Sequence, residues 1–214
     1  MKKHFVTIAA LVSVSSFCFA ADPAPVVNPD IAMALLEHGN AAFIDNPISK
    51  TQAIREARIS SIDSHTPIAV VVTCSDARTA PEHIFSKNLN RIFVVRTAGN
   101  VVDNIGLGSI EYAVKALGVR LVIVMGHQNC GAVKATIAGG SIPPHINSIV
   151  NLIKPAVVAA KKKQGDLLIN SIEANATRVS EKIRHDSDLG DAAKEVKVVP
   201  SYYSLDTGKV HWLN

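Results

Sequence analysis

The chain has 214 residues, of which 48% are apolar, and its formal net charge is +4. This length and this apolar content suit one compact domain with a buried core. The sequence has no basic stripe interleaved with aromatic residues, and only 5% of its residues are aromatic, which argues against nucleic acid as a partner.

The first twenty residues have the pattern of a cleavable secretory signal peptide. Lys2 and Lys3 precede an apolar stretch over residues 5–14, and small residues follow around Ala20. The apolar stretch is too short for a comfortable membrane span, which disfavours an anchor. Cleavage after Ala20 removes two lysines and no acidic residue, so the charge falls from +4 to +2. We expect a periplasmic protein without membrane contact after cleavage.

Residues 21–29 contain prolines and no apolar period, so we expect a flexible tether there. Residues 30–214 are predicted to form a single domain. Apolar residues from Asp30 to Phe43 indicate an amphipathic helix, with Asp30 placed to cap it. A second helix is predicted near residues 50–62.

Three short β-branched runs follow, over residues 68–73, 92–95 and 121–125. Each is too apolar to have a face in water, which is typical of buried parallel strands. Helical patterns over residues 81–86 and 108–117 separate these runs. This alternation predicts an α/β fold with a mainly parallel sheet of four to five strands flanked by helices.

After Gly131 the pattern is mostly helical, through residues 132–138, 146–162 and 169–183. Near the end of the chain, Thr207 and Gly208 separate two apolar runs. We interpret this segment as a hairpin added to the sheet.

Polar side chains gather where two of the predicted strands end. Cys74, Asp76 and Arg78 follow the first strand, and His127 and Cys130 follow the third. In open parallel sheets, ligand sites lie beyond the carboxyl ends of the strands. We therefore expect these five side chains to share one site.

Two thiolates, one imidazole and one carboxylate are a donor set that suits tetrahedral zinc. The spacing of His127 and Cys130 lets both side chains face one point across a helical turn. If Arg78 binds the Asp76 carboxylate through two hydrogen bonds, it competes with the metal for that oxygen. Zinc then keeps one exchangeable position, where bound water has a pKa of about 7.

The two cysteines left after signal cleavage also permit a different interpretation. In an exported protein, Cys74 and Cys130 could form one disulfide. The chain would then be an exported redox or zinc-binding module in which metal is dispensable. That interpretation leaves the adjacent imidazole, carboxylate and guanidinium unexplained.

The sequence resembles the β-class carbonic anhydrases. The resemblance covers nearly everything from about residue 30 to the end of the chain, and its motifs occur in order: PIAVVVTCSDAR, IFVVRTAGNVV, GSIEYAVKALGV, LVIVMGHQNCGAV and YYSLDTGKV. It implies a mainly parallel sheet whose long N-terminal helices pack on a partner subunit, in a homodimer or a dimer of dimers.

The resemblance implies one zinc ion per subunit, held by Cys74, His127 and Cys130. Asp76 is then the catalytic carboxylate, held by Arg78 or serving as the fourth zinc ligand in a closed state. The implied reaction is the reversible hydration of carbon dioxide to bicarbonate and a proton by zinc-bound hydroxide. Carbonyl sulfide or carbon disulfide is an alternative substrate for the same site.

Three positions depart from the family pattern. Ala77 replaces a serine, which removes no ligand. His65 stands where members often carry a glutamine that points at substrate; it could replace that hydrogen bond, assist proton transfer, or simply face water. Valines at residues 70–72 replace the tryptophan of a second bicarbonate pocket, so we expect that pocket to be absent and Arg96 and Tyr203 to have structural roles.

Overall fold

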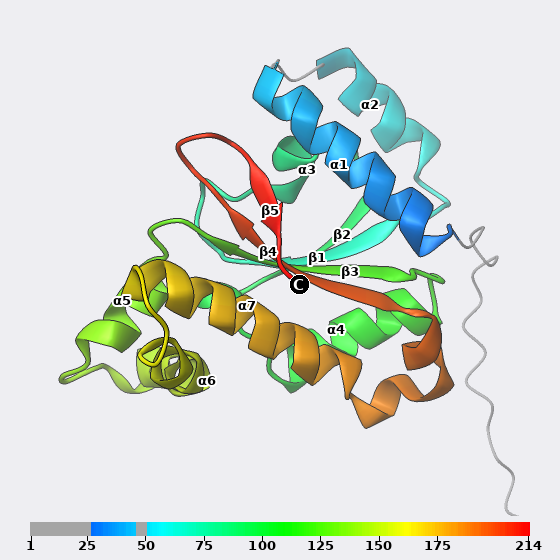
Figure 1. The fold of residues 1–214 in the computed structure, drawn as a ribbon. Coiled ribbons are helices and arrows are strands. Elements are labelled where there is room, and N and C mark those ends of the chain that lie inside the picture. Colours follow the sequence, from blue (N-terminus) through cyan, green and yellow to red (C-terminus); the bar gives the residue numbers. More distant parts are fainter. Residues whose placement is uncertain (1–26, 46–50) are drawn as a thin grey trace, which may run out of the picture.

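The computed structural model describes residues 27–45 and 51–214 (Figure 1). The predicted signal peptide and residues 21–26 of the predicted tether lie outside the described residues. The described helices are α1 (Pro29–Asp45), α2 (Thr51–Ser60), α3 (Pro81–Ile84), α4 (Asn104–Lys115), α5 (Gly131–Ala138), α6 (Pro144–Ala160) and α7 (Leu167–Arg184), with 3-10 helices η1 (Ala98–Asn100) and η2 (Ser187–Glu195).

Five strands form one sheet in the order β2-β1-β3-β4-β5. Neighbouring strands from β2 to β4 are parallel, and β5 is antiparallel to β4. The strands are β1 (Ala69–Thr73), β2 (Ile92–Arg96), β3 (Leu121–His127), β4 (Lys197–Tyr203) and β5 (Val210–Trp212). The predicted α/β fold, its mainly parallel sheet and its closing hairpin are confirmed.

Alternate residues of β1 enter two different cores, as the two-residue period of a strand requires. Val70 and Val72 pack with residues of α4 and α7 on one face of the sheet. Ala69 and Val71 pack with residues of α1 and α3 on the other. Figure 1 shows these helices on opposite sides of the sheet. Because both faces are covered, every residue of β1 and β3 is buried.

Helix α1 begins one residue earlier than the sequence predicted. Asn28 caps it, because its Oδ1 accepts a hydrogen bond from the Asp30 backbone N–H at 2.8 Å. The prediction that Asp30 is the cap is therefore wrong; its carboxylate pairs instead with Lys197 at 2.9 Å. Proline is favoured at the first helical position, and Pro29 occupies it here.

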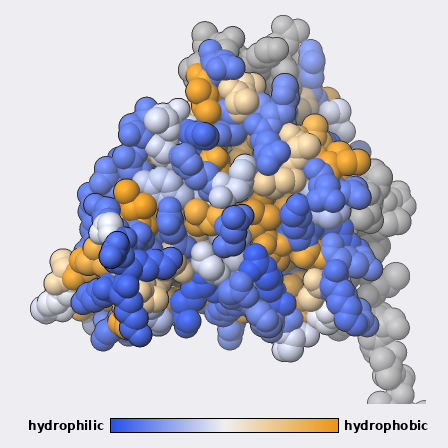
Figure 2. Space-filling model, viewed as in Figure 1, coloured by the Kyte–Doolittle hydropathy of each residue, from blue (hydrophilic) through white to orange (hydrophobic). Residues whose placement is uncertain are grey.

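Helix α1 leaves several apolar side chains in solvent. Ile31, Leu35 and Ile44 are all exposed on this helix, and Figure 2 shows hydrophobic surface along α1. Ile31 and Leu35, four residues apart, lie on the same side of this 17-residue helix, and an exposed apolar pair there suits packing against another protein chain.

Two further details differ from the sequence predictions. Helix α4 starts at Asn104 rather than residue 108, since the Asp103 side chain accepts a hydrogen bond from Gly106 N–H at 2.9 Å and caps it. The 3-10 segment η2 was not predicted. No helix in the described parts of the chain combines the length and the apolarity that crossing a bilayer requires.

Candidate metal centre

The carboxyl ends of β1 and β3 lie side by side, and this brings the two polar motifs together. Thr73, the last residue of β1, is in register with Met125 of β3. Cys74 follows Thr73 directly, and His127 is the last residue of β3. Cys130 then stands immediately before α5.

Cys74, His127 and Cys130 form one buried group of metal donors. Their ligand atoms all lie within 4.8 Å of one another. This is the scale of ligand separations around one zinc ion, whose bonds to sulfur and nitrogen are about 2.3 and 2.0 Å. Two soft sulfurs and one imidazole nitrogen are also the donor types that zinc prefers.

The tautomer of His127 is set by the backbone. Its Nδ1 lies 2.9 Å from the Gln128 carbonyl oxygen. A carbonyl can only accept, so Nδ1 carries the proton and Nε2 keeps a free lone pair. Within the described residues, Nε2 has no hydrogen-bond partner although the side chain is fully buried. A buried nitrogen of this kind is costly unless it binds something, and a metal ion satisfies it.

Cys74 and Cys130 are free thiols rather than a disulfide in this structure. Hydrogen bonds from Cys130 and from the Gly99 backbone N–H lower the pKa of Cys74 to about 4 despite its burial. The hydrogen bond that Cys130 makes to Cys74, together with burial, raises the pKa of Cys130. The buried Cys74 thiolate needs a cation beside it, and a zinc ion bound there would also displace the proton of Cys130.

Gly99 contributes a backbone donor to the site. Its N–H lies 3.2 Å from Cys74 Sγ. Its φ of 71° is in the left-handed region, and a Cβ would come within 2.7 Å of Ile153 Cδ1. Glycine is therefore required for this hydrogen bond to the thiolate.

Asp76 lies beside the donor group and is held by Arg78. Arg78 Nε donates to Asp76 Oδ1 at 2.9 Å, and Nη2 donates to Oδ2 at 2.7 Å. The Arg78 backbone N–H also donates to Oδ1 at 3.0 Å. These bonds hold the pKa of the Asp76 carboxyl well below its usual range. Asp76 Oδ2 is 3.9 Å from His127 Nε2, so the carboxylate faces the metal position while its oxygens bind the guanidinium.

Two residues that the sequence did not single out for the site fix the backbone around Cys74. Arg96 Nε donates to the Cys74 carbonyl at 3.0 Å, and its Nη2 donates to the Asp76 carbonyl at 2.6 Å. The buried Thr79 hydroxyl lies 3.0 and 2.9 Å from the same two oxygens. Arg96 has a structural role, as expected, but it acts directly on the metal loop.

His127 and Cys130 do face one point, as the sequence predicted, but they do not do so across a helical turn. A turn at residues 128 and 129 separates the strand from α5, and Asn129 has a φ of 60° there. Asparagine tolerates this left-handed conformation better than most residues. Gln128 anchors the turn, since its Oε1 accepts from the backbone of Leu205 at 2.8 Å and of Asp206 at 3.1 Å.

The structure does not place His65 with the metal donors of its own chain. His65 precedes β1, and its exposed ring stacks on Phe93 with centroids 5.8 Å apart. Residues 66–73 separate it from Cys74, and the five of them that form β1 alone span about 15 Å at about 3.3 Å per residue. His65 therefore lies too far from the metal donors of its own chain to contact them.

Comparison with known proteins identifies the family. Residues 69–210 match the family model described as carbonic anhydrase. A carbonic anhydrase of Mycolicibacterium smegmatis is 40% identical over 195 residues, which cover 87% of this chain and 94% of that protein. The chain belongs to the carbonic anhydrase family. Carbonic anhydrase 2 of Mycobacterium tuberculosis is 34% identical over 202 residues, covering 86% of this chain and 93% of the relative.

Its fold is that of the β-class. A crystal structure from work on two tetrameric β-carbonic anhydrases of Sordaria macrospora superposes with a TM-score of 0.67 at 19% identity, covering 86% of this chain and 95% of that one. The resemblance drawn from the sequence motifs is confirmed at the level of the class.

Proposed function

We propose that this β-carbonic anhydrase catalyses the reversible hydration of carbon dioxide to bicarbonate and a proton, with zinc as its cofactor. The observation that carries the proposal is the buried Cys74, His127 and Cys130 group, with the unpartnered His127 Nε2 beside a carboxylate held in place by arginine. Membership of the carbonic anhydrase family indicates carbon dioxide hydration, and this donor set suits that reaction.

Cys74 Sγ, His127 Nε2 and Cys130 Sγ are the proposed zinc ligands, with one ion per subunit. When bound there, zinc supplies a Lewis acid that makes a coordinated water molecule acidic near neutral pH. The protein contributes the fixed tautomer of His127 and the Gly99 N–H at Cys74, and both hold the donors toward one point.

Asp76 is the proposed catalytic residue. Arg78 donates hydrogen bonds to both of its oxygens and keeps it ionised, so Asp76 stays a hydrogen-bond acceptor and the guanidinium competes with a metal for its oxygens. In that state it accepts a hydrogen bond from the attacking water and orients the oxygen lone pair toward the carbon of carbon dioxide. The new C–O bond gives bicarbonate, and the released proton passes to solvent buffer.

His65 is proposed to act on substrate or proton transfer at the site of a neighbouring subunit. Its exposure and its stacking on Phe93 present it outward, away from the metal centre of its own chain. An imidazole can both donate and accept hydrogen bonds, which suits both roles.

We propose a homodimer or a dimer of dimers as the assembly. The exposed apolar residues Ile31, Leu35 and Ile44 of α1 support an interface on this helix. The Sordaria proteins described as tetrameric share this fold. Molar mass by light scattering would distinguish the two assemblies.

Export to the periplasm is also proposed, with the mature chain beginning at Ala21. The charged and apolar pattern of residues 1–20 supports this, and these residues lie outside the described structure. N-terminal sequencing of protein from the periplasmic fraction tests it; a chain that keeps Lys2 and Lys3 would contradict it.

The activity is tested by stopped-flow hydration of carbon dioxide on the purified mature chain, with zinc measured per subunit. We expect about one zinc per chain and fast hydration. Zinc-loaded protein that hydrates no carbon dioxide but releases sulfide from carbonyl sulfide or carbon disulfide would move the assignment to a sulfur hydrolase. Zinc-free protein with a Cys74–Cys130 disulfide would favour the redox module instead.

A further inference from the structure

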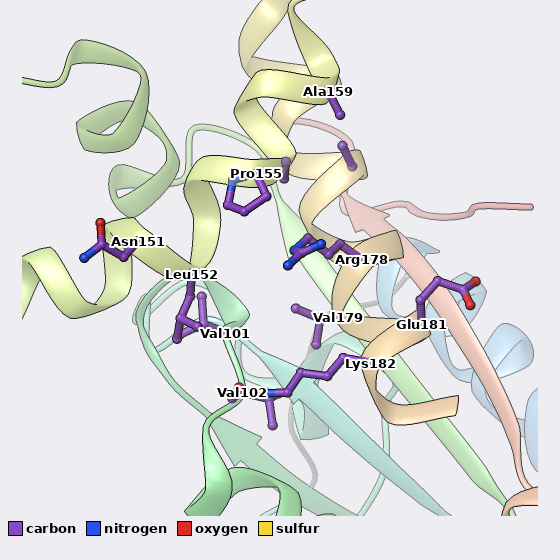
Figure 3. Close-up of a pocket in the computed structure, with 12 residues that line it drawn as sticks. Val101, Val102, Asn151, Leu152, Pro155, Ala159, Arg178, Val179, Glu181 and Lys182 are labelled. Carbon is purple, nitrogen blue, oxygen red and sulfur yellow. Dashed lines mark hydrogen bonds between the residues drawn. The ribbon is translucent and has the colours of Figure 1, made fainter. Parts of the chain in front are cut away.

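A second pocket lies between α6, α7 and the segment that follows η1, and none of the proposed metal ligands lines it (Figure 3). Its volume is about 640 Å³, within the range of roughly 300–1,000 Å³ typical of pockets that hold small organic ligands. Its walls are mainly apolar, from Val101, Leu152, Pro155 and Val179.

Two cationic side chains, Arg178 and Lys182, line this pocket. Figure 3 shows Arg178 from α7 extending into the space below Pro155. Among the described residues, no acidic side chain forms an ion pair with Arg178. Lys182 donates to the Val102 carbonyl at 2.7 Å, and that neutral acceptor leaves its charge in place.

The one acidic residue of the lining does not neutralise these cations. Glu181 forms an ion pair with Arg184, and its Oε2 lies 3.5 Å from His185 Nδ1; both partners lie outside the lining. In Figure 3 its carboxylate points away from Arg178. The pocket therefore combines apolar walls with an uncompensated positive charge.

We propose that this pocket binds an organic carboxylate with an apolar body, separately from the zinc site. A guanidinium binds a carboxylate through two parallel hydrogen bonds, and Arg178 can offer them without first breaking an ion pair. The apolar body lies against Val101, Leu152 and Val179, where its burial from water stabilises the complex. A small inorganic anion would leave these walls unused, and a neutral apolar molecule would leave the guanidinium unpaired.

Isothermal titration calorimetry of the zinc-loaded enzyme tests the site, with decanoate as the probe. We expect one decanoate per subunit. Acetate, which has the charge without the apolar body, and 1-decanol, which has the body without the charge, should each bind at least 10-fold more weakly.

Variants locate the binding. Arg178→Ala should weaken decanoate binding at least 10-fold, whereas Lys154→Ala removes one charge from the exposed side of α6 outside the lining and should leave it unchanged. Ala159→Trp places a large ring in the pocket from an exposed helix position and should also remove binding. All three variants should keep zinc and carbon dioxide hydration, because none of these residues belongs to the metal centre.

Three outcomes would overturn the proposal. Decanoate binding that survives both Arg178→Ala and Ala159→Trp would place the ligand elsewhere, for example at zinc. Binding of 1-decanol with the same affinity as decanoate would show that Arg178 does not recognise the carboxylate. No decanoate binding to the unaltered enzyme would refute the site, and a lower molar mass of Ala159→Trp by light scattering would then show that the pocket is an interface between copies of this chain.

Discussion

The two ends of β1 hold their side chains in different ways. At the carboxyl end, Cys74 and Asp76 are fixed by hydrogen bonds from Gly99, Arg78, Arg96 and Thr79 to side chains and backbone alike. At the amino end, His65 is exposed and held mainly by stacking on Phe93. Chemistry that depends on sub-ångström placement therefore belongs to the carboxyl end. Substitutions at the carboxyl end should change zinc binding, whereas substitutions at the amino end should leave it unchanged.

The largest effect is expected from removing a ligand at the carboxyl end. Cys130→Ser replaces a soft thiolate with a poorly acidic hydroxyl, so zinc should be lost and hydration should fall to the background rate. Elemental analysis and stopped-flow hydration measure both quantities. Full zinc occupancy in this variant would show that Cys130 is not a ligand.

Asp76→Asn should separate zinc binding from catalysis. The amide cannot keep the negative charge that accepts the proposed hydrogen bond, so hydration should fall about 100-fold or more while zinc stays bound. Asp191→Asn, an exposed aspartate paired with Lys194, is the matched control and should have normal activity. A fully active Asp76→Asn enzyme would refute the assigned role.

Arg96→Gln tests whether the backbone around Cys74 needs its anchor. Loss of the bonds to the Cys74 and Asp76 carbonyls should weaken zinc affinity about 10-fold to 100-fold, as for other groups that orient metal ligands. Competition with a zinc chelator measures this affinity. Arg120→Gln is the control, because Arg120 makes similar bonds to Glu195 and the Val114 carbonyl away from the site. Equal affinities of the two variants would contradict the prediction.

His65→Ala probes the amino end. The proposal that His65 serves a neighbouring subunit predicts a loss of several-fold in hydration, of order 10-fold at most, with unchanged zinc content. His65→Gln, which restores a hydrogen-bonding side chain, should recover part of the rate. Normal hydration in the assembled His65→Ala enzyme would leave His65 as a loop histidine facing water.

The smallest effect is expected at Asn90, also near the amino end. Its Oδ1 accepts from the Thr66 backbone N–H at 2.9 Å, and its φ of 67° suits asparagine. Asn90→Ala should lower the free energy of unfolding by about 1–2 kcal/mol, measured by urea denaturation, with unchanged zinc and hydration. Loss of zinc from this variant would show that the two ends of β1 are coupled.

The sequence was informative where residue type alone decides the outcome. Continuous β-branched runs predict buried parallel strands, and polar residues that follow them must meet at one edge of the sheet. This logic placed Cys74, Asp76, His127 and Cys130 together before any coordinates. The pairing of Arg78 with Asp76 followed from the chemistry of a guanidinium two residues from a carboxylate.

The remaining features, which are the hydrogen bonds around Cys74, the cap of α1 and the pocket beside Arg178, depend on how the folded chain is oriented, and the sequence does not report this. The bonds from Gly99 and Arg96 go to a sulfur and to carbonyls whose orientation arises only in the folded loop. Asn28 and Asp30 are both good helix caps, and Pro29 at the first helical position was the signal that favoured Asn28. The pocket beside Arg178 depends on the separation of α6 and α7, which no local pattern reports.

The most direct test of the metal centre is a crystal structure of the zinc-loaded enzyme with anomalous diffraction at the zinc edge. We expect one zinc peak per subunit, bonded to Cys74 Sγ, His127 Nε2 and Cys130 Sγ, with Asp76 still paired with Arg78. A zinc ion held elsewhere would contradict the assignment of the ligands. A zinc ion bonded to Asp76, with Arg78 released, would contradict the role of that pair in keeping a position open for water.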